Sequence, residues 1–262
     1  MESKQAIANE ILKWLDDGGA EIHTRPGSER LPGPLEWILK TSQFQDWLSD
    51  GPQTLLLVGR PGSGKTTAAS LIVDTLLRQD NPAHRIGVAF LHVGVGEDKR
   101  NAMQLSRSLL YQLGQQLASS FISPLDPTRM ECLLDPLREK SPYSNMNDMV
   151  SRILPHIVGK FGRVYVVVDE LDQMTGHRDP LRSSLISLAE KNFRLLFTTC
   201  HNPDADGRLR GALQIHICGA TVEGDLDTYV TQRLVDLPRF AQNRLKMQDF
   251  VKERVIEDAN GL

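Results

Sequence analysis

The chain has 262 residues, 40% of them apolar and 24% charged, and a formal net charge of -3. This length accommodates one large domain with appendages, the composition is ordinary for a soluble globular protein, and the charge predicts no nucleic-acid partner. Three widely spaced cysteines, the lack of a secretory pattern and the short apolar runs favour a cytoplasmic protein without a membrane span.

The first 50 residues are expected to form a helical lead-in and a linker. Apolar residues at helical spacing predict an amphipathic helix over 7–15, which Gly18 and Gly19 end. Residues 20–34 contain Pro and Gly and are typical of a linker. The segment 35–48 predicts one or two short helices from its apolar residues Leu35, Trp37, Ile38, Phe44, Trp47 and Leu48.

A strand, a glycine-rich loop and a helix follow. TLLLV at 54–58 is a short apolar run, and the pattern over 66–77 predicts a helix with one apolar face. The proline-rich stretch 121–146 is predicted to be an insertion or a long loop. Further buried strands are expected at 86–92, 164–172, 193–199 and 213–217, and helices at 101–120, 146–161 (interrupted near Pro155) and 181–191.

These elements predict an α/β fold. Continuous apolar strands separated by helices are typical of a parallel sheet that helices cover on both faces. We therefore expect a doubly wound, mostly parallel, five-stranded sheet over residues 51–220. Residues 221–262 are expected to be the truncated start of a helical subdomain.

The segment GRPGSGKT at 59–66 matches the phosphate-binding pattern G-x-x-x-x-G-K-[ST]. Glycines allow successive N–H groups to point at phosphate oxygens, and the following helix adds its positive N-terminal end. Lys65 is expected to reach the β and γ phosphates, and Thr66 to bind Mg²⁺ through its hydroxyl. The predicted nucleotide-binding residues are Gly59, Arg60, Pro61, Gly62, Ser63, Gly64, Lys65, Thr66, Thr67 and Thr199.

Carboxylates end the strand VYVVVDELD at 164–172. Asp169 is the candidate for the second Mg²⁺ ligand, because an aspartate at the end of a neighbouring buried strand has this role in P-loop enzymes. Either Glu170 or Asp172 could orient and deprotonate the attacking water, and the residues leave open which one does. Thr198 and Thr199 end a strand expected between these two strands, and are candidate sensors of the γ-phosphate.

With these motifs in order, the chain resembles the NACHT domains of signal-transducing (STAND) NTPases, the group that contains NOD-like receptors, and most closely the fungal members. The resemblance rests on LLLVGRPGSGKTTAAS, VYVVVDELDQ, RLLFTTCHNPD and DLDTYVTQRL. It implies a switch that holds ADP at rest, exchanges it for ATP and then oligomerises to activate an effector domain. It also implies that residues 34–37 lie near the base and ribose.

The predicted function is therefore an ATP/ADP-binding switch in innate immunity or self/non-self recognition, with effector and sensor domains outside this chain. Gln173 and Cys200 stand where the family often has an acidic residue and an arginine, which favours a weak, slow Mg²⁺-dependent NTPase with Lys65, Glu170 and Asp172 as catalytic residues. GTP in place of ATP is left open. The alternatives are an ordinary P-loop ATPase or small-molecule kinase, and a nucleotide-binding scaffold without turnover.

Overall fold

The structure is a computed structural model that describes residues 33–49, 51–79, 85–93, 102–119, 158–173, 185–186, 193–200, 209–234 and 245–260. The helix predicted over 7–15, the insertion predicted over 121–146, and most of the helices predicted over 146–161 and 181–191 lie outside these residues. No helix in the described part of the chain is long and apolar enough to cross a bilayer.

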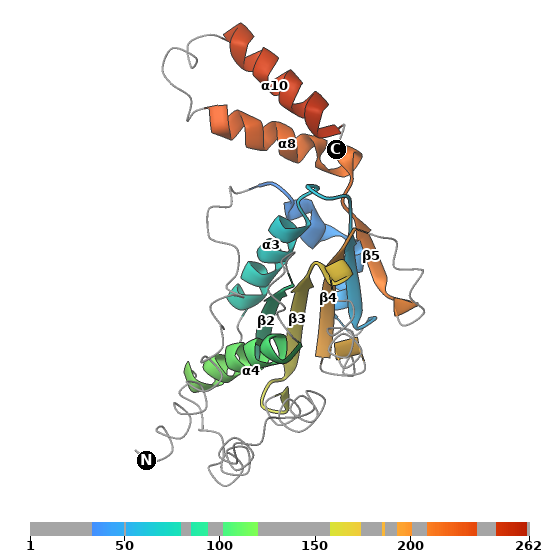
Figure 1. Cartoon of the computed structure of the whole chain (residues 1–262), viewed down its shortest axis with the longest axis vertical. Helices are drawn as coiled ribbons and strands as arrows, with labels where there is room; N and C mark the ends of the chain where they lie inside the picture. The colour runs from blue at the N-terminus through green and yellow to red at the C-terminus, as the bar shows by residue number, and fades with distance from the viewer. Residues whose placement is uncertain are drawn as a thin grey trace. The chain divides into compact units, whose positions relative to one another are not determined.

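Five strands form one parallel sheet (Figure 1). Their order is β2-β3-β4-β1-β5, and parallel pairings join β1 to β5, β2 to β3 and β3 to β4. The predicted α/β class is confirmed, and β4 lies between β3 and β1 as expected. The strands are β1 (Thr54–Val58), β2 (Ile86–His92), β3 (Arg163–Asp169), β4 (Phe193–Thr199) and β5 (Leu213–His216).

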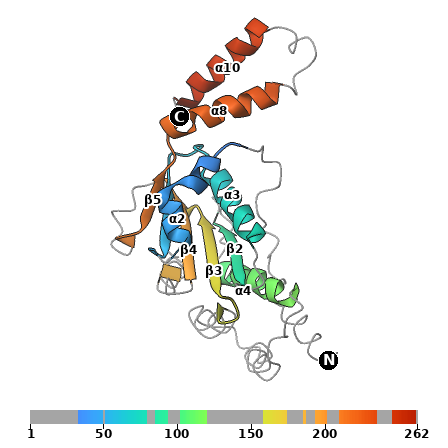
Figure 2. The same cartoon turned by 180° about the vertical axis from the view of Figure 1, so that it is seen from behind.

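One compact unit of the chain comprises Pro26–Ile72 and Thr198–Leu262. Its lead-in forms the short 3-10 helix η2 (Glu36–Lys40) and the helix α2 (Ser42–Leu48), which packs against β1 and β5 (Figure 2). Phe44 and Trp47 of α2 are both buried, with ring centroids 5.8 Å apart, so the predicted apolar face does form core. After β5, α8 (Gly219–Leu234) and α10 (Leu245–Asn260) lie side by side.

The other compact unit comprises Met1–Arg25 and Val73–Phe197. It contains β2, β3, most of β4 and the helix α4 (Ala102–Ser119), while α3 (Lys65–Arg78) runs from the first unit into this one. The strand predicted to continue to Asp172 ends at Asp169. Glu170 adopts φ 64, which interrupts the extended backbone, and the short 3-10 helix η3 (Leu171–Gln173) follows.

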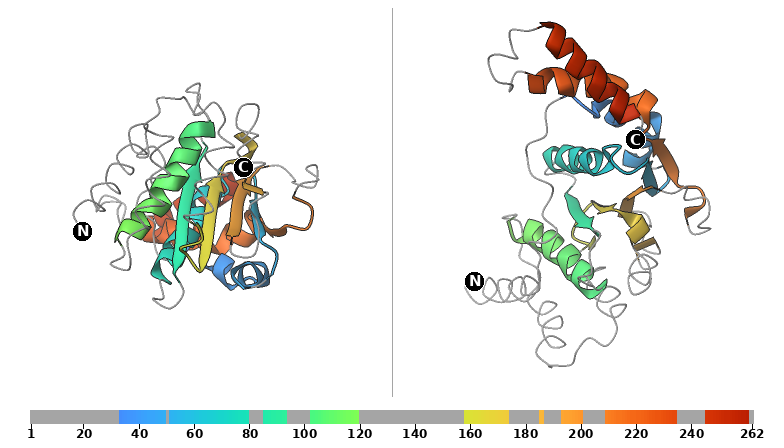
Figure 3. Two further views of the ribbon diagram at one scale, coloured as in Figure 1. Left: turned by 90° about the horizontal axis from the view of Figure 1, so that it is seen from below. Right: turned by 45° about the horizontal axis from the view of Figure 1, so that its top comes forward.

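The outer edge of β2 is covered by two glutamines of α4, which lies along this strand (Figure 3). Gln112 accepts from the N–H of Phe90 at 2.8 Å and donates to its carbonyl at 2.7 Å. Gln116 does the same for Val88, at 2.9 and 2.5 Å. Four residues of helix rise about 6 Å and two residues of strand about 6.6 Å, so the side-chain amides match the strand spacing.

This pairing predicts that Gln116→Leu destabilises the fold by about 2–4 kcal/mol, because it leaves a buried N–H and a buried carbonyl of Val88 without partners. The control is Gln115→Leu, which changes an exposed neighbour on the same helix and should alter stability by less than about 0.5 kcal/mol. Urea denaturation measures both. Equal losses for the two variants would show that the glutamine cover contributes nothing specific.

Candidate functional site

The predicted phosphate loop connects the end of β1 to the start of α3. Gly62 and Gly64 have φ of 80 and 92, in the left-handed region that side chains disfavour. Gly59 is required for a different reason, since a Cβ there would lie 2.5 Å from both the carbonyl oxygen of Ile217 and Oγ of Ser63. The loop therefore needs glycine for two reasons, a left-handed backbone at Gly62 and Gly64 and lack of space at Gly59.

Lys65 holds the loop closed from inside. Its side chain is only 8% exposed, and Nζ donates to the carbonyls of Gly59 at 2.8 Å and Arg60 at 2.7 Å. An ammonium group has three donors, so a third remains for a ligand while the loop keeps its shape. Oγ of Ser63 is buried and has no hydrogen-bond partner within the described part of the chain, which leaves a polar group of the loop available to an incoming oxygen.

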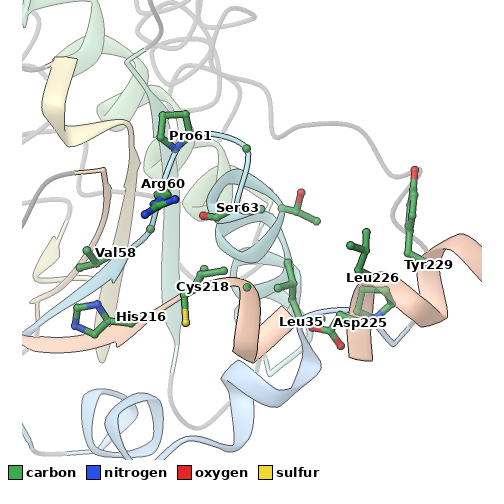
Figure 4. A pocket seen from close by; sticks show the side chains of 17 residues that line it. Leu35, Val58, Arg60, Pro61, Ser63, His216, Cys218, Asp225, Leu226 and Tyr229 are labelled. Carbon is green, nitrogen blue, oxygen red and sulfur yellow. Dashed lines mark hydrogen bonds between the residues drawn. The ribbon is translucent and has the colours of Figure 1, made fainter. Parts of the chain in front are cut away.

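A cavity of about 710 Å³ opens beside the loop, within the usual range for small-molecule sites (Figure 4). Arg60, Pro61 and Ser63 lie at one end of it, and Leu35, Asp225, Leu226 and Tyr229 at the other. The remaining lining residues are Pro34, Val58, Gly59, Gly62, Gly64, Thr67, His216, Ile217, Cys218 and Gly219.

The predicted nucleotide-binding residues take different places around this cavity. Seven of them line it, namely Gly59 to Gly64 and Thr67, whereas Lys65 and Thr66 are not among its lining residues. Thr199 contributes through its backbone, because its carbonyl accepts from the N–H of Gly59 at 3.1 Å while its side chain is buried. Thr198 is buried as well. The roles predicted for these side chains stay predictions.

Asp169 ends β3 with a fully buried carboxylate. Its Oδ2 lies 3.0 Å from Nδ1 of His92, the residue opposite it in the pairing of β2 with β3. This contact with His92 restricts the orientation of the carboxylate. His92 was not among the predicted site residues, although its place at the end of the strand paired with β3 is the signal that could have found it.

The other two candidate carboxylates follow directly. Glu170 has φ 64, a left-handed conformation that costs a residue with a side chain about 1–2 kcal/mol. Asp172 lies in η3 and is partly exposed. Among the described residues, no group of three or more His, Cys, Asp or Glu side chains could hold a metal unaided. A cation here would need oxygens from its ligand and from water.

The family model of the nephrocystin 3 N-terminal region matches residues 33–199, which is 167 of the 262 residues. The chain belongs to the nephrocystin 3 N-terminal family. The matched stretch begins at the lead-in that lines the cavity, includes the phosphate loop and ends with β4. The predicted P-loop NTPase class is thus confirmed, while NACHT and its fungal members stay a prediction.

Two solved structures are similar to this member of the nephrocystin 3 N-terminal family. The ORC1 protein of Aeropyrum pernix, in complex with DNA, is 12% identical with a TM-score of 0.45, over 85% of this chain and 53% of that one. A STAND protein of Pyrococcus horikoshii with a tetratricopeptide repeat sensor is 17% identical with a TM-score of 0.47, over 88% and 29%. This chain therefore spans about half of the first protein and under a third of the second. No curated protein matches it.

The glycines of this family member's loop can be tested by a matched pair of substitutions. We expect Gly59→Ala to destabilise the fold by about 3 kcal/mol, because the new Cβ would overlap a backbone oxygen that cannot rotate away. Gly62→Ala should cost only about 1 kcal/mol, since its Cβ would meet no atom within 4 Å and only the left-handed backbone opposes it. Urea midpoints at constant m value report the difference. Similar midpoints would contradict this account of Gly59.

The backbone of Glu170 gives a second prediction. Glu170→Gly should stabilise the protein by about 0.5–1 kcal/mol relative to Glu170→Ala, because both variants lose the carboxylate and only glycine relieves the left-handed strain. Chemical denaturation gives the free energy of unfolding of both variants. Because neither variant has the glutamate side chain, their difference reports the cost of the left-handed backbone. A glycine variant no more stable than the alanine variant would mean that Glu170 is not strained in solution.

Proposed function

We propose that the chain is an ATP/ADP-binding switch module that uses Mg²⁺. The observation that carries this proposal is the closed phosphate loop, with Lys65 bonded to two of its carbonyls, beside a cavity of about 710 Å³. The first turn of α3 has N–H groups that the helix cannot satisfy, because its first internal bond runs from Ala68 to Gly64. Such a turn, a loop lysine and a buried serine hydroxyl suit a phosphate chain.

The residues present also fit a magnesium ion. Mg²⁺ is held in phosphate-transfer sites by one or two protein oxygens, with phosphates and water completing the shell. Thr66 would supply a hydroxyl and Asp169 a carboxylate oxygen, and hard oxygen ligands of this kind are the ones that Mg²⁺ takes. When bound, the ion neutralises charge on the phosphate oxygens. His92 supports the assignment by orienting Asp169.

Hydrolysis is proposed to be weak. Lys65 would place one ammonium donor on the phosphates, and Glu170 or Asp172 would accept a proton from the attacking water. Glu170 directly follows Asp169 and holds a strained backbone, and strain of this kind concentrates at functional positions. That conformation favours Glu170 of the two. Gln173 and Cys200, which stand where the resembling NACHT proteins often carry charge, support slow turnover.

The role that we propose in the cell is the one implied by the resemblance to NACHT domains. We propose a cytoplasmic signalling protein of the NACHT and NOD-like receptor type, acting in innate immunity or self/non-self recognition. The exchange of ADP for ATP would control its homo-oligomerisation, with effector and sensor domains outside this chain. Membership of the nephrocystin 3 N-terminal family supports the nucleotide module, and the signalling role rests on the resemblance alone.

A thermal-shift panel with ATP, ADP and GTP, each with and without Mg²⁺, tests the proposal. A nucleotide at about one hundred times its Kd should stabilise the fold by about 2.7 kcal/mol, which for a chain of this size raises Tm by about 5–10 °C. Lys65→Ala should abolish the shift, because it removes the buried charge and both loop bonds. Lys40→Ala, which removes an exposed lysine of η2, should leave it unchanged.

The panel separates binding from metal use. Asp169→Asn should keep the shift that ATP gives alone and lose the increment that Mg²⁺ adds, since the amide still accepts a bond but carries no charge. An absence of any shift with all three nucleotides would overturn the proposed function. So would a full shift in Lys65→Ala.

A further inference from the structure

The cavity has two chemically different ends. The loop end presents backbone groups, Arg60 and the hydroxyl of Ser63, which suit an anion. The far end is lined by Leu35, Leu226 and the ring of Tyr229, with Asp225 as its charged residue. An apolar wall that contains a carboxylate repels further phosphate, and it suits a flat, neutral group that carries hydrogen-bond donors.

Asp225 connects two distant segments at this end. Its Oδ2 accepts from the N–H of Leu35 at 2.8 Å and from Nε1 of Trp37 at 2.9 Å, residues 190 and 188 positions away in the chain. Bonds to a carboxylate are stronger than neutral ones. Helix α8 therefore holds the lead-in segment at the wall of the cavity through one oxygen atom.

Leu35 is the residue that this bond holds in place. Its φ of 67 is left-handed, an uncommon state for a bulky residue, yet its side chain is 5% exposed. Its Cδ1 lies 3.4 Å from where a Cβ on Gly64 would be, so the leucine covers the phosphate loop at the start of α3. Strained residues persist where their surroundings over-determine them, and Asp225 on one side and Gly64 on the other provide that constraint here.

We propose that Asp225 is a positioning residue for the nucleoside half of the ligand, an inference that rests on the proposed function. By fixing Leu35 and Trp37 it shapes the apolar wall that receives the base. The ring of Tyr229 completes this wall, with the guanidinium of Arg233 5.7 Å from its centroid. The phosphates are bound by the loop, which Asp225 does not touch. Loss of Asp225 should therefore weaken the binding of nucleosides and leave the binding of phosphate chains largely unchanged.

The test compares ATP with inorganic tripolyphosphate, both with Mg²⁺, by calorimetric titration of the full chain. In the unchanged protein ATP should bind at least about tenfold more tightly than tripolyphosphate, because only ATP reaches the far end. Asp225→Ala should raise the Kd for ATP by about tenfold or more, because the charge-assisted bonds to Leu35 and Trp37 are lost. The Kd for tripolyphosphate should change by less than about twofold.

Three further variants serve as controls. Asp227→Ala removes the same charge from α8, from a residue that pairs with Lys252 at 2.7 Å and is not among those lining the cavity, and should leave both affinities unchanged. Asp225→Asn keeps an acceptor oxygen and should preserve most of the preference for ATP. Trp37→Phe removes one of the two bonds while keeping an aromatic ring, so it should give a partial loss even if Asp225→Ala fails to fold.

The outcomes distinguish this inference from the proposed function. Equal weakening of ATP and tripolyphosphate in Asp225→Ala, or an ATP affinity unchanged in both Asp225→Ala and Trp37→Phe, would overturn the inference and leave nucleotide binding intact. Tripolyphosphate binding that survives Lys65→Ala, or no binding of either ligand to the unchanged protein, would overturn the proposed function and this inference with it.

Discussion

The two hydrogen bonds from Nζ of Lys65 to the carbonyls of Gly59 and Arg60 determine the shape of the whole site. They place a buried cation at the centre of the loop and direct two carbonyl oxygens inward to it. Glycine favours this loop at Gly62 and Gly64 through their positive φ, and at Gly59 because a Cβ has no space there.

Backbone strain marks one position in each compact unit. Among the described residues, Leu35 and Glu170 are the non-glycine residues with positive φ; Leu35 lines the cavity, and Glu170 directly follows Asp169. Their constraints differ. Leu35 is held by a carboxylate of a distant helix and by packing against the loop, whereas Glu170 lies between the end of β3 and the start of η3. In both cases glycine would adopt the positive φ at a lower free-energy cost, which indicates that the side chain at each position has a role.

The parts of this structure that sequence predicts are those in which the pattern is local. The loop at 59–66 and the strands TLLLV and VYVVVD are continuous in the chain, and their glycine spacing and apolar runs were enough to place them. Contacts between remote segments were not predictable in this way. Asp225 with Leu35, His92 with Asp169 and Gln112 with Phe90 each join residues that are 22 to 190 positions apart, and no periodicity records such a pairing. The sequence also did not predict that β3 ends at Asp169, three residues earlier than expected. The strand ends there because Glu170 has a positive φ, which the residue type glutamate does not indicate.

The hydrogen bonds that hold Leu35 can be compared with the free energy that the proposed switch requires. A ligand moves a two-state equilibrium only through its differential affinity, and a change from 1:99 to 99:1 requires about 5.5 kcal/mol. Two hydrogen bonds to a carboxylate contribute about 1.5–3 kcal/mol each, hence about 3–6 kcal/mol for the pair that Asp225 makes. Because α8 also packs against α10, a ligand that strengthens or breaks this pair changes the attachment of both helices to the lead-in segment. The upper end of the range for the pair reaches the roughly 5.5 kcal/mol of a full switch, so one carboxylate can supply a large part of the coupling between the cavity and the helices that follow the sheet.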